Sequence, residues 1–215
     1  MKKTVKSKNN RLTLPLMIAL AVILAVGGAI ALANGLGGNE TQTGLLTGKH
    51  YVQIDIADYG TITAELDADA APITVTNFMK LAESGFYDGL TFHRIISGFM
   101  IQGGDPNGNG TGGSSEKIKG EFKANGIDNA IVHERGVLSM ARSMAYDSAS
   151  SQFFIMHEKA PHLDGQYAAF GKVLTGMEVV DAICAGVPVT DANGTVAKAD
   201  QPVIASIRRI EAPAR

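Results

Sequence analysis

The sequence contains a single cysteine, Cys184, and no tryptophan. One cysteine can form neither an internal disulfide nor a thiolate metal cluster, so both are excluded. Basic residues are not in excess, since 19 Lys and Arg stand against 21 Asp and Glu. With a net charge of −2 and no aromatic residues interleaved with basic runs, the chain lacks the features of a nucleic-acid-binding protein. We therefore expect no nucleic-acid partner.

Metal and hydrolase motifs are also missing. His157 and His162 are five positions apart, a spacing that suits neither one face of a helix nor alternate positions of a strand. A zinc site needs three or four converging ligands, so we predict no metal site. Serines are frequent over residues 143–151, but no Gly-x-Ser-x-Gly motif marks a nucleophile. Hydrogen bonding within a loop is the simpler role for these serines.

Glycine is abundant, with 25 residues, which indicates many tight turns and favours a β-rich fold. Residues 108–113 match the Gly-x-Gly-x-x-Gly pattern, and Asp128 follows at the spacing of a dinucleotide-binding domain. That motif must lead directly into a helix, whereas residues 114–120 have no amphipathic pattern and contain another glycine. We interpret the segment as a flexible loop and predict no cofactor.

The chain begins with a basic flank, residues 1–11, followed by an uncharged run over residues 12–33. As a helix this run would be roughly 33 Å long, enough to cross a bilayer core. The basic flank should stay cytoplasmic and the rest of the chain extracytoplasmic. Two outcomes are open: a retained signal anchor, favoured by the length of the run, or cleavage after Ala33. We expect a single-pass protein of the cell membrane, or a secreted protein if cleavage occurs.

A flexible glycine-rich linker should occupy residues 34–48, and the globular domain residues 49–215. Alternating apolar residues predict a hairpin of two strands over 52–56 and 62–66. Pro72 is suited to the first turn of a helix that Gly85 would end.

The remaining elements continue the β pattern. Further strands are predicted twice within 92–102 and at 136–141, 152–157, 168–173 and 203–210. Thr175 and Glu178 match a capping box at the start of a second helix, residues 177–184. These elements predict a mainly β fold: a closed eight-stranded antiparallel barrel capped by two helices, preceded by the N-terminal transmembrane or signal helix.

The most informative stretch is residues 92–105, where two apolar strands enclose a turn and carry one arginine, Arg94. A permanent cation among apolar neighbours either extends from a barrel wall into solvent or points at a polar group in an apolar cleft. The residue pattern alone leaves both interpretations open.

Three blocks, in order, resemble the cyclophilins, a family of peptidyl-prolyl cis–trans isomerases. Residues 93–105 read HRIISGFMIQGGD, and residues 136–142 with 151–155 read GVLSMAR and SQFFI. Residues 163–167 with 170–173 read LDGQY and FGKV. The resemblance covers residues 50–211 and implies the barrel fold and prolyl isomerase activity without a cofactor.

The resemblance also implies roles for individual residues. Arg94 would be the catalytic donor to the amide nitrogen, and Gln102 would orient Arg94 or contact the substrate. Ala141 and Arg142 would present backbone groups to the residues preceding proline. The full set of implied substrate-binding residues is Phe99, Met100, Ala141, Arg142, Gln152, Phe154, His162, Leu163 and Tyr167.

Two positions depart from many family members: His162 replaces a tryptophan and Tyr167 a histidine. The loss of an indole should weaken cyclosporin binding more than catalysis. We expect a monomer that acts on X–Pro segments of unfolded or exported proteins and reaches the membrane through its N-terminal helix. The alternative is a membrane-tethered peptide-binding or chaperone module with little turnover, for which a cation at the amide nitrogen would have little use.

Overall fold

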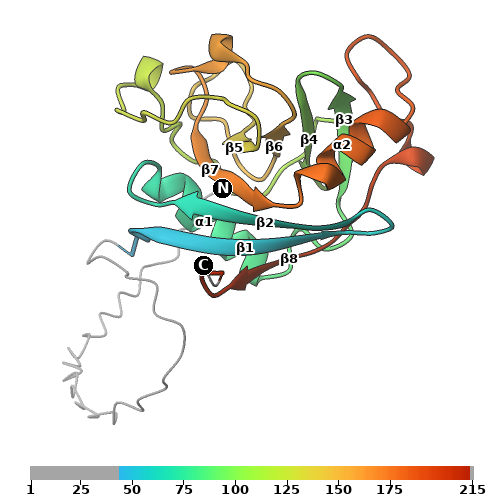
Figure 1. Cartoon of the computed structure of the whole chain (residues 1–215). Coiled ribbons are helices and arrows are strands. Elements are labelled where there is room, and N and C mark those ends of the chain that lie inside the picture. The colour runs from blue at the N-terminus through green and yellow to red at the C-terminus, as the bar shows by residue number, and fades with distance from the viewer. Residues whose placement is uncertain (1–43, 214–215) are drawn as a thin grey trace, which may run out of the picture. The chain divides into compact units, whose positions relative to one another are not determined.

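The computed structural model describes residues 44–213. The predicted basic flank, N-terminal helix and most of the linker lie outside the described residues. Within them the chain forms eight strands and two α-helices (Figure 1). No helix in this part of the chain is both long and apolar enough to cross a bilayer.

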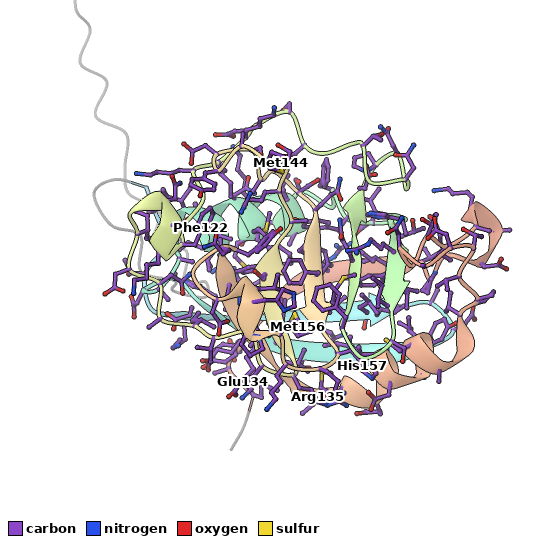
Figure 2. All side chains as sticks on the ribbon, turned by 90° about the horizontal axis from the view of Figure 1, so that it is seen from above. Phe122, Glu134, Arg135, Met144, Met156 and His157 are labelled. Atoms are coloured by element: carbon purple, nitrogen blue, oxygen red, sulfur yellow. The ribbon has the colours of Figure 1, made fainter. Side chains whose placement is uncertain are left out.

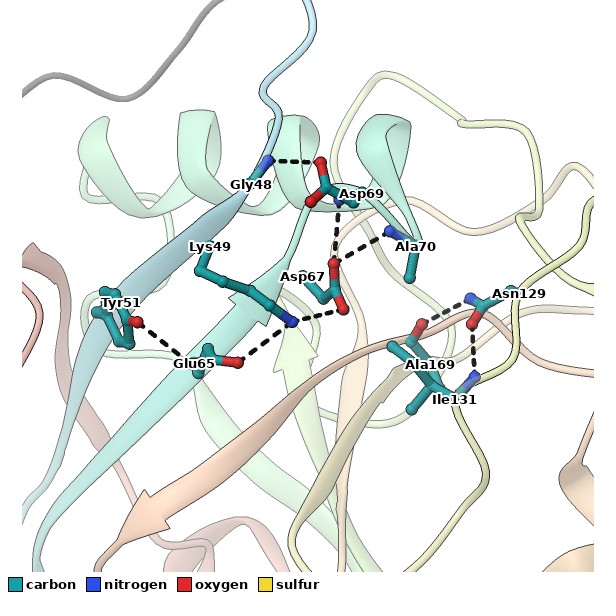
Figure 3. Close-up of polar contacts among 10 residues, drawn as sticks. All are labelled: Gly48, Lys49, Tyr51, Glu65, Asp67, Asp69, Ala70, Asn129, Ile131 and Ala169. Atoms are coloured by element: carbon teal, nitrogen blue, oxygen red, sulfur yellow. Dashed lines mark hydrogen bonds and ion pairs between the residues drawn. The ribbon is translucent and has the colours of Figure 1, made fainter.

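The predicted N-terminal hairpin is confirmed. It consists of β1 (Lys49–Ile56) and β2 (Gly60–Asp67), which pair in register with Ile54 opposite Ile62. Every second residue is buried from His50 in β1 and from Ile62 in β2, as the alternation of apolar residues predicts. At the open end of the hairpin, Lys49 Nζ lies 2.6 Å from Asp67 Oδ2 and 3.3 Å from Glu65 Oε1 (Figure 3).

The first helix, α1 (Pro72–Glu83), begins at Pro72 as predicted, but no side chain of its own N-terminus caps it. The cap comes instead from the long loop after β4. Glu121 accepts hydrogen bonds from the backbone N–H groups of Ile73 at 2.9 Å and Thr74 at 2.7 Å. Its carboxylate therefore satisfies two of the free amides and stands at the positive end of the helix.

The other strands are β3 (Thr91–Ile96), β4 (Met100–Asp105), β5 (Val137–Met140), β6 (Phe153–Met156), β7 (Ala169–Thr175) and β8 (Ile204–Ile210). All pairs are antiparallel, and the sheet order is β3-β4-β6-β5-β7-β2-β1-β8. Asn129 fastens the long loop to this sheet by donating to the carbonyl of Ala169 at 2.7 Å (Figure 3).

The sequence predicted a closed barrel, whereas the structure forms an eight-stranded antiparallel half-barrel. Its outer strands do not pair along their length. They meet through an isolated bridge between Thr91 and Val203, flanked by backbone hydrogen bonds from Phe92 to Pro202 and from Ile204 to Leu90. We call this contact the seam.

The predicted capping box of the second helix, α2 (Met177–Gly186), is wrong. The N-cap residue is Gly176, in the left-handed region at φ +92°, and no side chain in the described part of the chain caps the helix. Thr175 belongs to β7, so it cannot serve as the cap. A side chain at Gly176 would also collide with the carbonyl oxygen of Thr61, which explains why glycine makes this turn.

Two hydrophobic clusters fill the fold. The larger joins β1, β2, both helices and a group of aromatic rings in which Phe78 contacts Tyr87, Phe153 and Phe170 at centroid distances of 5.1–5.3 Å. The smaller lies between β4, β5 and β6 and includes Phe154. Figure 1 shows α2 beside the β3–β4 hairpin and α1 behind the β1–β2 hairpin.

Candidate active site

The smaller cluster forms the floor of a pocket of about 370 Å³, which we call the central pocket. Ten of the eleven site residues implied by the sequence line it: Arg94, Phe99, Met100, Gln102, Ala141, Arg142, Phe154, His162, Leu163 and Tyr167. The eleventh, Gln152, lines an adjoining side pocket that shares Gln102, Ala141 and Arg142 with the central one. The fold thus gathers residues from segments far apart in the sequence, while their individual roles stay predictions.

Strand register explains the apolar part of the pocket. Met100 is opposite Met156 and Gln102 is opposite Phe154 across β4 and β6, so alternate side chains of both strands reach the same face. Two aromatic contacts close the walls. The Phe99 ring stacks on His162 with 5.6 Å between centroids, and Phe154 meets Tyr167 edge-on at 6.1 Å. His162 therefore forms part of the pocket wall at the position where many family members have tryptophan.

Arg94 reaches the rim of this pocket from β3 and is held on two sides. Its Nε donates to the carbonyl of Asn193 at 2.8 Å, and its Nη1 donates to Oε1 of Gln102 at 3.3 Å. Burial lowers the pKa of Arg94, and Asp191 opposes that shift. Since an arginine titrates far above neutral pH, it stays a cation. Sequence reasoning missed Asn193, which lies 99 positions away and contributes only a backbone carbonyl.

A chain of amide groups continues from Arg94 into the glycine-rich loop. Gln102 Nε2 donates to Oε1 of Gln152 at 2.9 Å, and Gln152 Nε2 donates to the carbonyls of Gly110 at 3.1 Å and Gly112 at 2.7 Å. The loop that matched the dinucleotide pattern thus supports the site instead of opening a helix.

The same loop is organised around the buried carboxylate of Asp105. The backbone N–H groups of Asn107, Asn109 and Gly110 donate to it at 2.6–3.1 Å. Burial acts to raise the pKa of Asp105, but these amides outweigh it and hold the pKa below its ordinary value. The carboxylate therefore stays charged and keeps the loop in place.

The side chain of Arg142, for which the sequence implied no role, connects two loops. Its guanidinium carbon lies 4.6 Å from the ring centre of Tyr167, 5.1 Å from Tyr146 and 5.2 Å from Phe122. Its Nε and Nη2 also donate to the carbonyl of Gln166 at 3.1 and 3.0 Å. Arg142 thus ties the loop after β5 to the segment that carries Tyr167.

One further polar cluster does not form a hydrolase site. His133 lies 2.9 Å from Asp164 and 3.0 Å from Ser139, but Ser139 is fully buried and cannot meet a substrate. In the part of the chain that the structure describes, no group of three or more His, Cys, Asp or Glu could hold a metal ion.

Comparison with known proteins decides the family. Residues 51–209 match the family model of the cyclophilin type peptidyl-prolyl cis–trans isomerases. The chain belongs to this family. It is a cyclophilin-type peptidyl-prolyl cis–trans isomerase, as the three sequence blocks predicted.

Relatives and solved structures agree with this assignment. Peptidyl-prolyl cis–trans isomerase B of Bacillus subtilis is 53% identical over 123 residues, covering 57% of this chain and 82% of the relative. A Synechococcus elongatus isomerase is 47% identical over 141 residues, covering 62% and 92%. A Cryptosporidium parvum cyclophilin crystal structure matches with TM-score 0.68 and 32% identity, covering 77% of this chain and all (100%) of that one. The same cyclophilin in the presence of the dipeptide Ala-Pro matches with TM-score 0.67 and 33% identity, covering 75% and 99%.

Proposed function

We propose that this cyclophilin assists the folding of exported proteins by stabilising the twisted X–Pro amide with Arg94, while the apolar part of the central pocket grips the proline ring. One observation carries the proposal. Arg94 is held by Asn193 and Gln102 at the rim of a pocket whose walls include Phe99 and Phe154.

The chemistry requires no nucleophile and no metal. Rotation about a peptide bond costs about 18–20 kcal/mol because amide resonance is lost on twisting. In the twisted state the nitrogen regains its lone pair and can accept a hydrogen bond, which it cannot do when planar. A donor that bonds only the twisted form lowers the barrier without stabilising the bound substrate. Arg94 suits this role because its fork is rigid and stays charged.

Exchange NMR on an unstructured X–Pro peptide tests the role of Arg94. The full-length chain in mild detergent should accelerate exchange, and Arg94→Ala should lose about 100-fold or more of the acceleration. Arg94→Lys, which keeps the charge but lacks the fork, serves as the matched control and should recover only part of it. A folded Arg94→Ala variant within threefold of the wild type would refute the role of Arg94. Peptide binding without acceleration would favour a binding module.

The site of action is the second part of the proposal. The uncharged run over residues 12–33 and the basic flank before it support a single-pass anchor with the isomerase domain outside the cytoplasm. The wild-type chain, expressed in a bacterium, should sediment with membranes and be digested by protease added to spheroplasts. Leu20→Arg combined with Leu24→Arg should leave the isomerase domain in the cytoplasm, where the added protease cannot reach it. A soluble, periplasmic product beginning after Ala33 would show cleavage instead of anchoring.

A further inference from the structure

One histidine from outside the central pocket fastens the turn between β3 and β4. The backbone N–H of Gly98 donates to Nδ1 of His157 at 2.8 Å, and the backbone N–H of His157 donates to the carbonyl of Phe99 at 2.9 Å. Gly98, with φ +79°, directly precedes Phe99, which lines the pocket. His157 thus holds the segment that carries one pocket wall.

These contacts determine which ring nitrogen carries the proton. A neutral imidazole nitrogen that accepts a hydrogen bond has no proton, so the proton of His157 lies on Nε2. That atom is 3.1 Å from Oδ1 of Asp181, to which it can donate. The geometry therefore selects a single neutral tautomer, with Gly98 on one side of the ring and Asp181 on the other.

Arg135 completes the arrangement. Its Nη2 lies 2.7 Å from both carboxylate oxygens of Asp181, and its Nη1 donates to the carbonyl of His157 at 2.8 Å. Figure 2 shows Arg135 and His157 on the same side of the molecule, beside α2. The histidine side chain is only 16% exposed, so its orientation is set by these partners and not by solvent.

We propose that His157, oriented by Asp181 and Arg135, is a positioning residue that sets the place of Phe99 in the central pocket. It lines neither pocket and touches no reacting atom, so it acts through the turn. The proposal rests on the proposed function, because it concerns the wall that would grip the proline ring. A shift of a pocket wall weakens substrate binding while leaving the Arg94 donor in place.

Charged side chains from two other elements surround His157 and fix its ring. They are Asp181 on α2 and Arg135 before β5, and Arg135 also lies 4.0 Å from Glu158. Cys184, near Asp181, stays neutral because burial raises its thiol pKa to about 11.

Three variants of the full-length chain test the proposal. In His157→Asn, the side-chain oxygen can replace Nδ1 as acceptor for Gly98. His157→Leu lacks any acceptor, and the longer side chain of His157→Gln directs its amide towards Asp181. The leucine and glutamine variants should raise the KM for an X–Pro peptide about five- to tenfold with kcat within about twofold, and the asparagine variant should keep both near wild type. The glutamine variant keeps the test decisive if leucine impairs folding.

The split between KM and kcat, together with rescue by asparagine, is a readout that a purely structural role would not change. Equal KM values for the asparagine, glutamine and leucine variants would overturn the positioning role. If the wild type bound peptide without accelerating exchange, the proposed function would fail, and peptide affinities of the same variants would still decide the role of His157.

Discussion

Gln102 and Gln152 are joined by a hydrogen bond of 2.9 Å that fixes which way the Gln102 amide faces. Because the Gln102 nitrogen donates to Gln152, its oxygen is left to accept from Arg94 at 3.3 Å. The orientation of the Arg94 side chain is therefore set through Gln102 by Gln152, which the glycine-rich loop holds in place.

This chain of contacts predicts that Gln152→Leu lowers kcat/KM by about five- to tenfold, the effect of about 1 kcal/mol from one lost hydrogen bond. Gln102→Leu should cost at least as much. The double variant should lose less than the product of the two single losses, because both residues act through Arg94. Exchange NMR on the four proteins measures this coupling, and strictly independent effects would contradict the proposed chain.

A second prediction concerns Arg142 and its three aromatic neighbours. Arg142→Ala should lower the free energy of unfolding by about 1–2 kcal/mol, since cation–π contacts and charged hydrogen bonds are lost together. Arg142→Lys should recover only part of this, because an ammonium lacks the planar fork. Urea denaturation measures the loss. Hydrogen exchange should also quicken in the loop that carries the 94% exposed Met144 (Figure 2). Unchanged hydrogen exchange in that loop would contradict the inference that Arg142 holds it in place.

The remote cap of α1 gives a third prediction. Glu121→Gln keeps one acceptor oxygen and should lower the free energy of unfolding by about 1 kcal/mol. Glu121→Ala leaves both helix amides without a side-chain acceptor and should lower it by about 2–3 kcal/mol. Glu116→Ala is the matched control, because among residues 44–213 that carboxylate makes only an exposed contact with Lys80. Equal denaturation midpoints for the two alanine variants would rule out the cap.

Acid should destabilise the fold through two buried histidines, His93 and His133. Burial lowers the pKa of both below the ordinary 6.5, partly opposed by Asp105 at the first and Asp164 at the second. The unfolded chain therefore binds protons first as the pH falls, so stability is full above about pH 6.5 and declines below it. His93→Leu should flatten this slope and, by removing a ring with no hydrogen-bond partner among the described residues, add about 1 kcal/mol at pH 7. Urea titrations at pH 7.5 and 5.5 measure both effects, and an unchanged slope would contradict the assignment to His93.

Local patterns in the sequence were enough for most of the strands, and the resemblance of three sequence blocks was enough for the family. The hairpin followed from alternation at Ile54 and Ile62, and the first helix from Pro72. The capping box failed because β7 extends through Thr175 and the left-handed Gly176 makes the turn into α2, close against Thr61 of β2.

The contacts that sequence reasoning missed are long-range ones. Glu121 meets α1 across 48 positions, and Asn193 meets Arg94 across 99. Neither leaves a periodic signal, because one is a single carboxylate in a loop and the other a backbone carbonyl. The eleven site residues came from the resemblance, and no local pattern would have selected Gln152 among them.

The seam and the place of β8 have a consequence for biosynthesis. β1, the first strand of the described residues, pairs on one side with β8, which ends at Ile210, and the bridge from Thr91 needs Val203. Contacts of such long sequence separation form late and slowly. One edge of β1 therefore stays unpaired until β8 has been synthesised. The domain cannot complete its sheet until its last described strand has left the ribosome.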